Sequence, residues 1–107
     1  NILDLLDIEN ENLPTKFSLN KPYPNPFNPF INISFDIAKS SQVSLVVYDL
    51  AGHYIKTLSD SYLNPGRHQL IWDAQDEYGK IVSTGVYLIT FIVEDYYQKT
   101  EKILFLK

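Results

Sequence analysis

Two histidines are the side chains of this chain best suited to acid–base or metal chemistry. His53 and His68 are its only histidines, and each falls in a segment of alternating polar and apolar residues. A histidine-based catalytic or zinc site needs further ligands or a nucleophile. The stretch Ser83–Thr84–Gly85 lacks the G-x-S-x-G frame of a nucleophile elbow. The pattern therefore favours structural histidines and predicts that the chain is not an enzyme.

A short acidic stretch offers oxygen ligands. Asp73, Asp76 and Glu77 lie close together ahead of Gly79. Calcium takes several carboxylate and carbonyl oxygens from a flexible loop, but the alternating D-x-D-x-D-G spacing is absent. We expect the two aspartates to accept hydrogen bonds from the backbone of their own turn, with a calcium site as the alternative.

Aromatic rings offer a third kind of chemistry, stacking on a carbohydrate. The tyrosines near predicted turns are Tyr54, Tyr62, Tyr78, Tyr96 and Tyr97. Trp72 lies in an alternating segment, where a tryptophan ring is more often a core anchor. An extracellular carbohydrate-binding or adhesive module is therefore the second interpretation of this chain, and a planar row of exposed rings would favour it.

Composition indicates what must position these residues. With 107 residues, of which 45% are hydrophobic and 14% aromatic, the chain is long enough for one small domain with a packed core. It has no cysteine, which removes disulfides and thiolate metal sites. No apolar run approaches the roughly 20 residues that span a bilayer, and no secretory signal peptide is visible. Because the chain starts with Asn1 rather than Met, we expect a piece of a longer protein.

The net charge of −4 is unevenly placed. The charged residues before Lys16 are all acidic: Asp4, Asp7, Glu9 and Glu11. Without residues 1–15 the chain carries nine acidic and nine basic side chains. Such a neutral pattern offers no electrostatic footprint for nucleic acid. We interpret residues 1–15 as an acidic linker from an upstream domain and 16–107 as the folded domain.

Alternation with a period of two predicts an all-β fold. The expected strands are 31–37, 43–48, 53–58, 67–73, 86–93 and 100–107. Turn residues separate them, including Gly52, Pro65–Gly66 and Gly79. This is the pattern of an antiparallel β-sandwich of about seven strands. The weak alternation of 53–58 suits an edge strand, and 100–107 is apolar enough to be buried on both faces.

The stretch KPYPNPFNPF, residues 21–30, holds four of the six prolines. Proline fixes φ and removes a backbone donor, and it biases the preceding residue toward extended conformations. We therefore expect an extended ribbon in which Tyr23 and Phe27 lie on the same side as anchors. Asn25 and Asn28 can bond to nearby backbone. In purely mechanical terms the ribbon would be a rigid lead-in that covers an edge strand.

Four blocks of this chain, in order, resemble a known family. They are SLNKPYPNPFNPFINISFDI, VSLVVYDLAGHYIKTL, PGRHQLIWDAQDEYGKIVSTGVYLITF and KTEKILFLK. Together they look like the type A C-terminal sorting domain of the type IX secretion system. The recognition motif comprises Tyr23, Pro24, Asn25, Pro26, Phe27, Asn28 and Pro29. The turn and core signature comprises Gly52, Gly66, Trp72, Asp73, Asp76, Gly79, Gly85 and Tyr87. The C-terminal docking strand comprises Lys102, Ile103, Leu104, Phe105, Leu106 and Lys107.

The resemblance implies an immunoglobulin-like β-sandwich that acts as a non-catalytic secretion signal. It implies that an upstream cargo protein passes through the periplasm and outer membrane by the type IX translocon, to be secreted or held at the cell surface. A sortase-like surface peptidase would cut the domain off, and the acidic leader would hold the cleavage region. No cofactor, metal or small-molecule substrate is implied. The chain is also similar to the immunoglobulin-like domain of flagellar hook-capping proteins.

Three positions depart from the family pattern. Ala74 stands where the family usually has glycine after Trp-Asp. Asn20–Lys21 replaces the more common Gln-Asn, and Phe30–Ile31 replaces a polar, threonine-containing pair. None of these removes a turn glycine or a core position.

Overall fold

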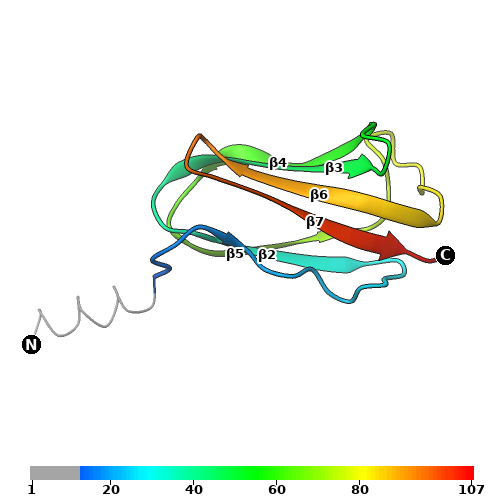
Figure 1. Cartoon of the computed structure of the whole chain (residues 1–107), viewed down its shortest axis with the longest axis horizontal. Helices are drawn as coiled ribbons and strands as arrows, with labels where there is room; N and C mark the ends of the chain where they lie inside the picture. Colours follow the sequence, from blue (N-terminus) through cyan, green and yellow to red (C-terminus); the bar gives the residue numbers. More distant parts are fainter. Residues whose placement is uncertain (1–12) are drawn as a thin grey trace, which may run out of the picture.

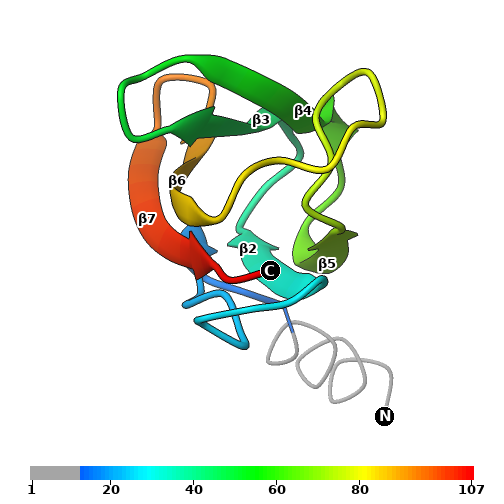
Figure 2. The ribbon, with the colours of Figure 1, turned by 90° about the vertical axis from the view of Figure 1, so that its right-hand side faces the viewer.

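A computed structural model describes residues 13–107, so most of the predicted linker lies outside the described residues. Two antiparallel sheets pack face to face (Figures 1 and 2). One has the strand order β1-β2-β5 and the other β4-β3-β6-β7. The strands are β1 (Ser18–Leu19), β2 (Ile31–Ile37), β3 (Ser41–Asp49), β4 (Tyr54–Leu63), β5 (Gly66–Trp72), β6 (Gly85–Val93) and β7 (Tyr97–Phe105). The predicted all-β sandwich is confirmed, and no helix of residues 13–107 is long and apolar enough to cross a membrane.

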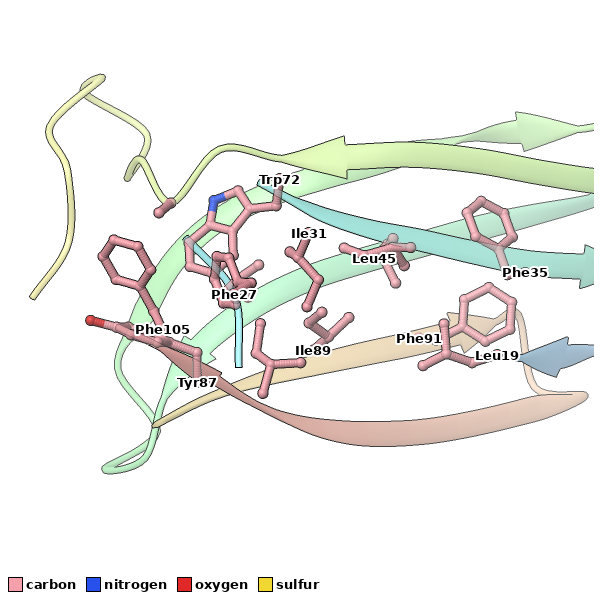
Figure 3. Close-up of a cluster of buried hydrophobic side chains, with 14 of the residues drawn as sticks. Leu19, Phe27, Ile31, Phe35, Leu45, Trp72, Tyr87, Ile89, Phe91 and Phe105 are labelled. Carbon is pink, nitrogen blue, oxygen red and sulfur yellow. The ribbon is translucent and has the colours of Figure 1, made fainter. Parts of the chain in front are cut away.

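Alternating residues build the core between the sheets. In β2 every second side chain, from Ile31 to Ile37, is buried, and the residues between them are partly exposed. The same pattern recurs in β3 and β6. Because successive side chains of a strand point to opposite faces, each sheet turns one apolar face inward. Figure 3 shows the resulting core, with Phe35, Phe91 and Leu19 at one end and Trp72, Phe27 and Phe105 at the other.

The edges of the four-stranded sheet refine two expectations. β4 is an edge strand, as its weak alternation predicted. β7 is the other edge, and the expectation that its sequence is buried on both faces is wrong. Its inward residues Ile103 and Phe105 are buried, whereas Gln98 and Lys102 are exposed. The outer face of this sheet meets no second layer among the described residues, so apolar content alone overstated the burial of this strand.

Reversals occur at the predicted turn residues. The amide of Gly52 donates to the carbonyl of Asp49 at 3.0 Å, which closes the β3–β4 hairpin. The φ of Gly52 is +90°, a conformation that glycine adopts at little cost. The amide of Tyr96 donates to Val93 at 2.9 Å and closes the β6–β7 hairpin. β4 and β5 change sheets across Asn64–Pro65.

Candidate functional site: the end of the sandwich built by the signature residues

The proline segment, residues 21–30, bends rather than running as an extended ribbon. The bends fall at 24–26 and 28–29, and the peptide bonds before Pro24, Pro26 and Pro29 are cis. The expectation of an extended ribbon is therefore wrong. Phe27 is a buried anchor, as expected, with 2% of its surface exposed. Tyr23 is not, since it is 57% exposed.

This segment pairs with the outer edge of β7. The amide of Phe27 donates to Leu104 at 3.0 Å, and the amide of Leu106 donates to Phe27 at 3.1 Å. The side chain of Asn25 extends the pairing: its Nδ2 donates to the carbonyl of Lys102 at 3.2 Å, and its Oδ1 accepts from the amide of Leu104 at 2.9 Å. An asparagine side chain thereby takes the place of a backbone amide where a proline has none.

The same segment also pairs with β2. Tyr23 and Asn32 exchange two backbone hydrogen bonds, of 3.1 and 2.7 Å. Because β2 and β7 belong to different sheets, the segment bridges the seam between them. A sequence pattern cannot show the pairing with β7, because the partners of Asn25 there, Lys102 and Leu104, lie 77 and 79 residues away. The expectation that the segment covers an edge strand is confirmed.

Four aromatic rings, from the recognition motif, the turn and core signature and the C-terminal docking strand, meet beneath this bridge. Phe27 lies with its ring centroid 5.7 Å from that of Trp72 and 5.1 Å from that of Phe105. Tyr87 meets Trp72 edge-on at 5.6 Å. The polar atoms of these rings have hydrogen-bond partners. Trp72 Nε1 donates to the carbonyl of Gln75, and the Tyr87 hydroxyl donates to the carbonyl of Ser83. Trp72 is a core anchor, and burial of the Tyr87 ring raises the pKa of its hydroxyl.

The acidic stretch forms a capped loop between β5 and β6. Asp76 Oδ1 accepts hydrogen bonds from the amides of Tyr78 and Lys80, at 2.9 and 3.0 Å. Asp73 Oδ1 accepts from Gln75 at 3.3 Å. The predicted capping role is confirmed. Among residues 13–107 no group of three or more histidine, aspartate or glutamate side chains gathers as a metal would require.

Ala74 has a left-handed backbone in this loop. Its φ is +61°, and it is fully buried. Residues with a Cβ adopt this region at a cost, whereas glycine does not. This conformation gives a physical reason for the glycine that the family usually has at this position. Ala74 therefore does replace a turn glycine, and the expectation that the departures leave the turn glycines in place is wrong here.

The two histidines lie far apart in the fold. His68 stacks on Phe35 with a centroid distance of 5.5 Å, and its Nε2 lies 2.8 Å from the carbonyl oxygen of Asn64. His53 is exposed beside Asp49, which accepts a hydrogen bond from the His53 amide at 2.8 Å. That bond lowers the pKa of the Asp49 carboxyl. Both histidines have structural contacts, as predicted.

In the described part of the chain the tyrosines near turns do not stack on one another, although Tyr54 meets Tyr48 edge-on at 6.5 Å. Tyr54, Tyr62, Tyr78 and Tyr96 are exposed, but Tyr97 packs against the core beside Phe91. Tyr96 stacks on Phe17, and Lys39 Nζ lies 4.0 Å from the centre of the Tyr96 ring. Among residues 13–107 this is the stacked pair that involves one of these five tyrosines. This arrangement gives no support to the interpretation as a carbohydrate-binding module.

The fold and this end of the molecule define an immunoglobulin-like β-sandwich whose signature residues close one seam. A family model described as a secretion system C-terminal sorting domain matches residues 21–106. The chain therefore belongs to the family of secretion system C-terminal sorting domains, whose role is that of a secretion signal. Such a signal is typically non-catalytic, and it implies export to the cell surface or medium.

Solved structures share the fold. PorZ, a surface component of the type-IX secretion system of Porphyromonas gingivalis, is 18% identical with a TM-score of 0.58, over 85% of this chain and 11% of that chain. Latent PorU of the same organism is 17% identical with a TM-score of 0.67, over 85% and 9%. FlgD of Xanthomonas campestris is 20% identical with a TM-score of 0.57, over 84% and 67%. The chain thus spans about a tenth of PorZ and PorU. A comparison of this chain with curated proteins found no match.

Proposed function

We propose that this domain directs an upstream cargo protein across the outer membrane through the type IX translocon. The observation that carries the proposal is the meeting of the family's separate motifs at one end of the fold. Phe27, Trp72, Tyr87 and Phe105 pack together there. A carbohydrate-binding module would need exposed rings on a common plane, whereas these rings are buried.

The motif divides into a buried part and an exposed part. Phe27 lies inside, whereas residues 23–26 and 28–30 are exposed around it. We infer that the buried ring fixes the shape and that the exposed residues belong to the surface that the translocon contacts.

The terminal residues 102–107 are proposed as a second contact. Their outer edge is already paired with Asn25 and Phe27, so a partner strand reaches that edge only after the proline segment is displaced. The side chain of Leu106 is exposed and reachable without displacement. The sortase-like peptidase and the cleavage region in residues 1–15 complete the proposed route, which leads from the periplasm to the surface.

The test is a reporter fusion. Residues 1–107 are attached to the C-terminus of a periplasm-directed fluorescent protein in a bacterium with a working type IX system, and a strain without the translocon is the control. We expect reporter at the surface or in the medium only when the translocon is present. Folded reporter trapped in the periplasm of both strains would reduce the family membership to a shared fold.

The terminal contact needs a variant that keeps the core. Deletion of Ile103–Lys107 should abolish export, but it also removes Ile103 and Phe105, each 1% exposed, so circular dichroism would show an unfolded domain. Leu106→Glu changes an exposed side chain instead. We expect this variant to lose export with an unchanged melting temperature, and normal export would exclude residue 106 from the contact.

A further inference from the structure

Strand β5 is one edge of the three-stranded sheet. The hydrogen bonds that β2 makes on its other side, away from β5, show which backbone groups of β5 point outward. Asn32 exchanges its hydrogen bonds with Tyr23, and the carbonyl of Ser34 accepts from Asn20. These two residues of β2 therefore direct their backbone groups away from β5. Their partners in β5 are Ile71 and Gln69.

In an antiparallel ladder, hydrogen-bonded and non-hydrogen-bonded pairs alternate. The N–H and C=O groups of Arg67, Gln69 and Ile71 must therefore face outward from the sheet edge. Within residues 13–107, no hydrogen bond reaches the backbone groups of these three residues from outside the sheet. The register of β5 on β2 is continuous from Gly66 to Trp72, so this stretch has no bulge.

The other long edges carry features that hinder the addition of a strand. β7 is covered by the proline segment at 102–106. β4 has two register shifts against β3, which leave Leu58 and Ile55 without partners. Such bulges disrupt pairing and protect natural edges. Among residues 13–107 nothing covers the edge of β5, and its register on β2 has no shift.

A depression lies beside the β5 edge, in the seam between β4 and β5. Its volume is about 370 Å³, and its apolar lining includes Leu58, Leu70 and Phe30. Phe30 and Ile71 are each 58% exposed. Lys56 lines the same depression and has no salt bridge to another described residue, and Asp73, whose Oδ1 accepts a hydrogen bond from the Gln75 amide, lines it as well. The groove therefore suits apolar side chains, and an acidic neighbour fits it only on the Lys56 side.

We propose that the β5 edge receives an extended strand of the translocon. The strand pairs with Arg67, Gln69 and Ile71, its apolar side chains occupy the groove over Leu58 and Leu70, and an acidic side chain meets Lys56. This mode of recognition takes affinity from backbone hydrogen bonds and specificity from alternate side chains. The inference rests on the proposed function, because the translocon is the partner it names.

Gln69 allows a test by a matched pair of substitutions. Gln69→Pro deletes one outward N–H, and proline is tolerated where an edge N–H faces solvent. Gln69→Ala keeps that N–H and, like Gln69→Pro, loses the 3.4 Å contact of the Gln69 side chain with Asn32. In the reporter fusion we expect loss of export for Gln69→Pro and normal export for Gln69→Ala, with both domains folded by circular dichroism.

Each outcome separates the inference from the proposed function. Export of all three forms would overturn strand addition at β5 and leave the sorting role intact. Failure of the unsubstituted domain itself would overturn both. A wild-type dimer in sedimentation velocity that Gln69→Pro dissociates would assign the edge to a second copy of this chain and overturn the translocon as its occupant.

A second measurement covers the case in which Gln69→Pro does not fold. Amide hydrogen exchange of the wild-type domain is followed by NMR with and without the translocon purified in detergent. We expect the amides of Gln69 and Ile71 to exchange fast in the free domain and slowly in the mixture. Unchanged exchange at both amides would contradict the proposal.

Discussion

The two seams of this sandwich differ in how they are closed. Between β7 and β2 the proline segment bonds to both sheets, and Phe27 fills the space beneath it. Between β4 and β5 the chain crosses once at Asn64–Pro65 and leaves a groove beside an edge that no other strand of residues 13–107 pairs with. The first seam is sealed by residues that are poor strand formers, which prevents the cover from offering a new edge.

The difference shows that a proline-rich segment can pair with a strand edge through side-chain as well as backbone hydrogen bonds. Asn25 supplies through its side chain the donor and acceptor that a strand would supply through its backbone. The prolines then leave few free donors on the outside of the segment. The motif thereby covers the edge of β7 at residues 102–106.

The largest expected effect comes from the ring that fills the closed seam. Phe27→Ala removes a side chain that contacts the rings of Trp72 and Phe105, so we expect a loss of about 3–5 kcal/mol in the free energy of unfolding. Urea denaturation measures it. Phe30→Ala is the matched control, since that ring is exposed at the open seam, and a change within about 0.5 kcal/mol is expected. Equal losses would contradict the distinction between the seams.

A smaller loss is expected from the asparagine that imitates a strand. Asn25→Ala leaves the amide of Leu104 and the carbonyl of Lys102 without this partner, which should cost about 1–2 kcal/mol. Exchange of the Leu104 amide should accelerate more than the global change in stability explains. Asn28→Ala is the control, because no side-chain hydrogen bond of Asn28 is found in the described part of the chain. A silent Asn25→Ala would show that Phe27 alone seals the seam.

A substitution in the loop between β5 and β6, at the end of the open seam, should increase the stability of the domain. The amide of Glu77 donates to the carbonyl of Ile55 at 3.1 Å and ties this loop to β4. Ala74→Gly relieves a left-handed backbone in the same loop, and we expect a gain of up to about 1 kcal/mol by thermal denaturation. A loss would show that the buried methyl group contributes more than its backbone conformation costs.

The smallest expected effect is a pH dependence at the β3–β4 hairpin. The hydrogen bond from the His53 amide lowers the pKa of Asp49 below its ordinary value of 3.8. A carboxyl with a lowered folded pKa contributes stability above its unfolded pKa and loses it as the pH falls through the folded pKa. Unfolding curves between pH 2 and 6 should therefore show a weaker acid loss for Asp49→Asn than for the wild type. Parallel curves would exclude a role for this carboxyl.

The sequence predicted the strands and the capped loop because both depend on local patterns. Alternation located β2 at 31–37 without error, and the oxygen atoms of Asp76 bond within four residues. It did not predict β1, which has only two residues, or the bends of the proline segment. It also could not reveal the partners of Asn25, because pairing across 77 residues depends on the packed fold and leaves no periodicity.

The roles of the seams can be compared in one experiment, amide hydrogen exchange of the free domain. The amides of Leu104 and Leu106 bond to the proline segment, whereas those of Arg67, Gln69 and Ile71 face outward. We predict strong protection for the first two and exchange near the rate of an unstructured chain for the other three. Comparable protection at both edges would contradict the account of one sealed and one open seam.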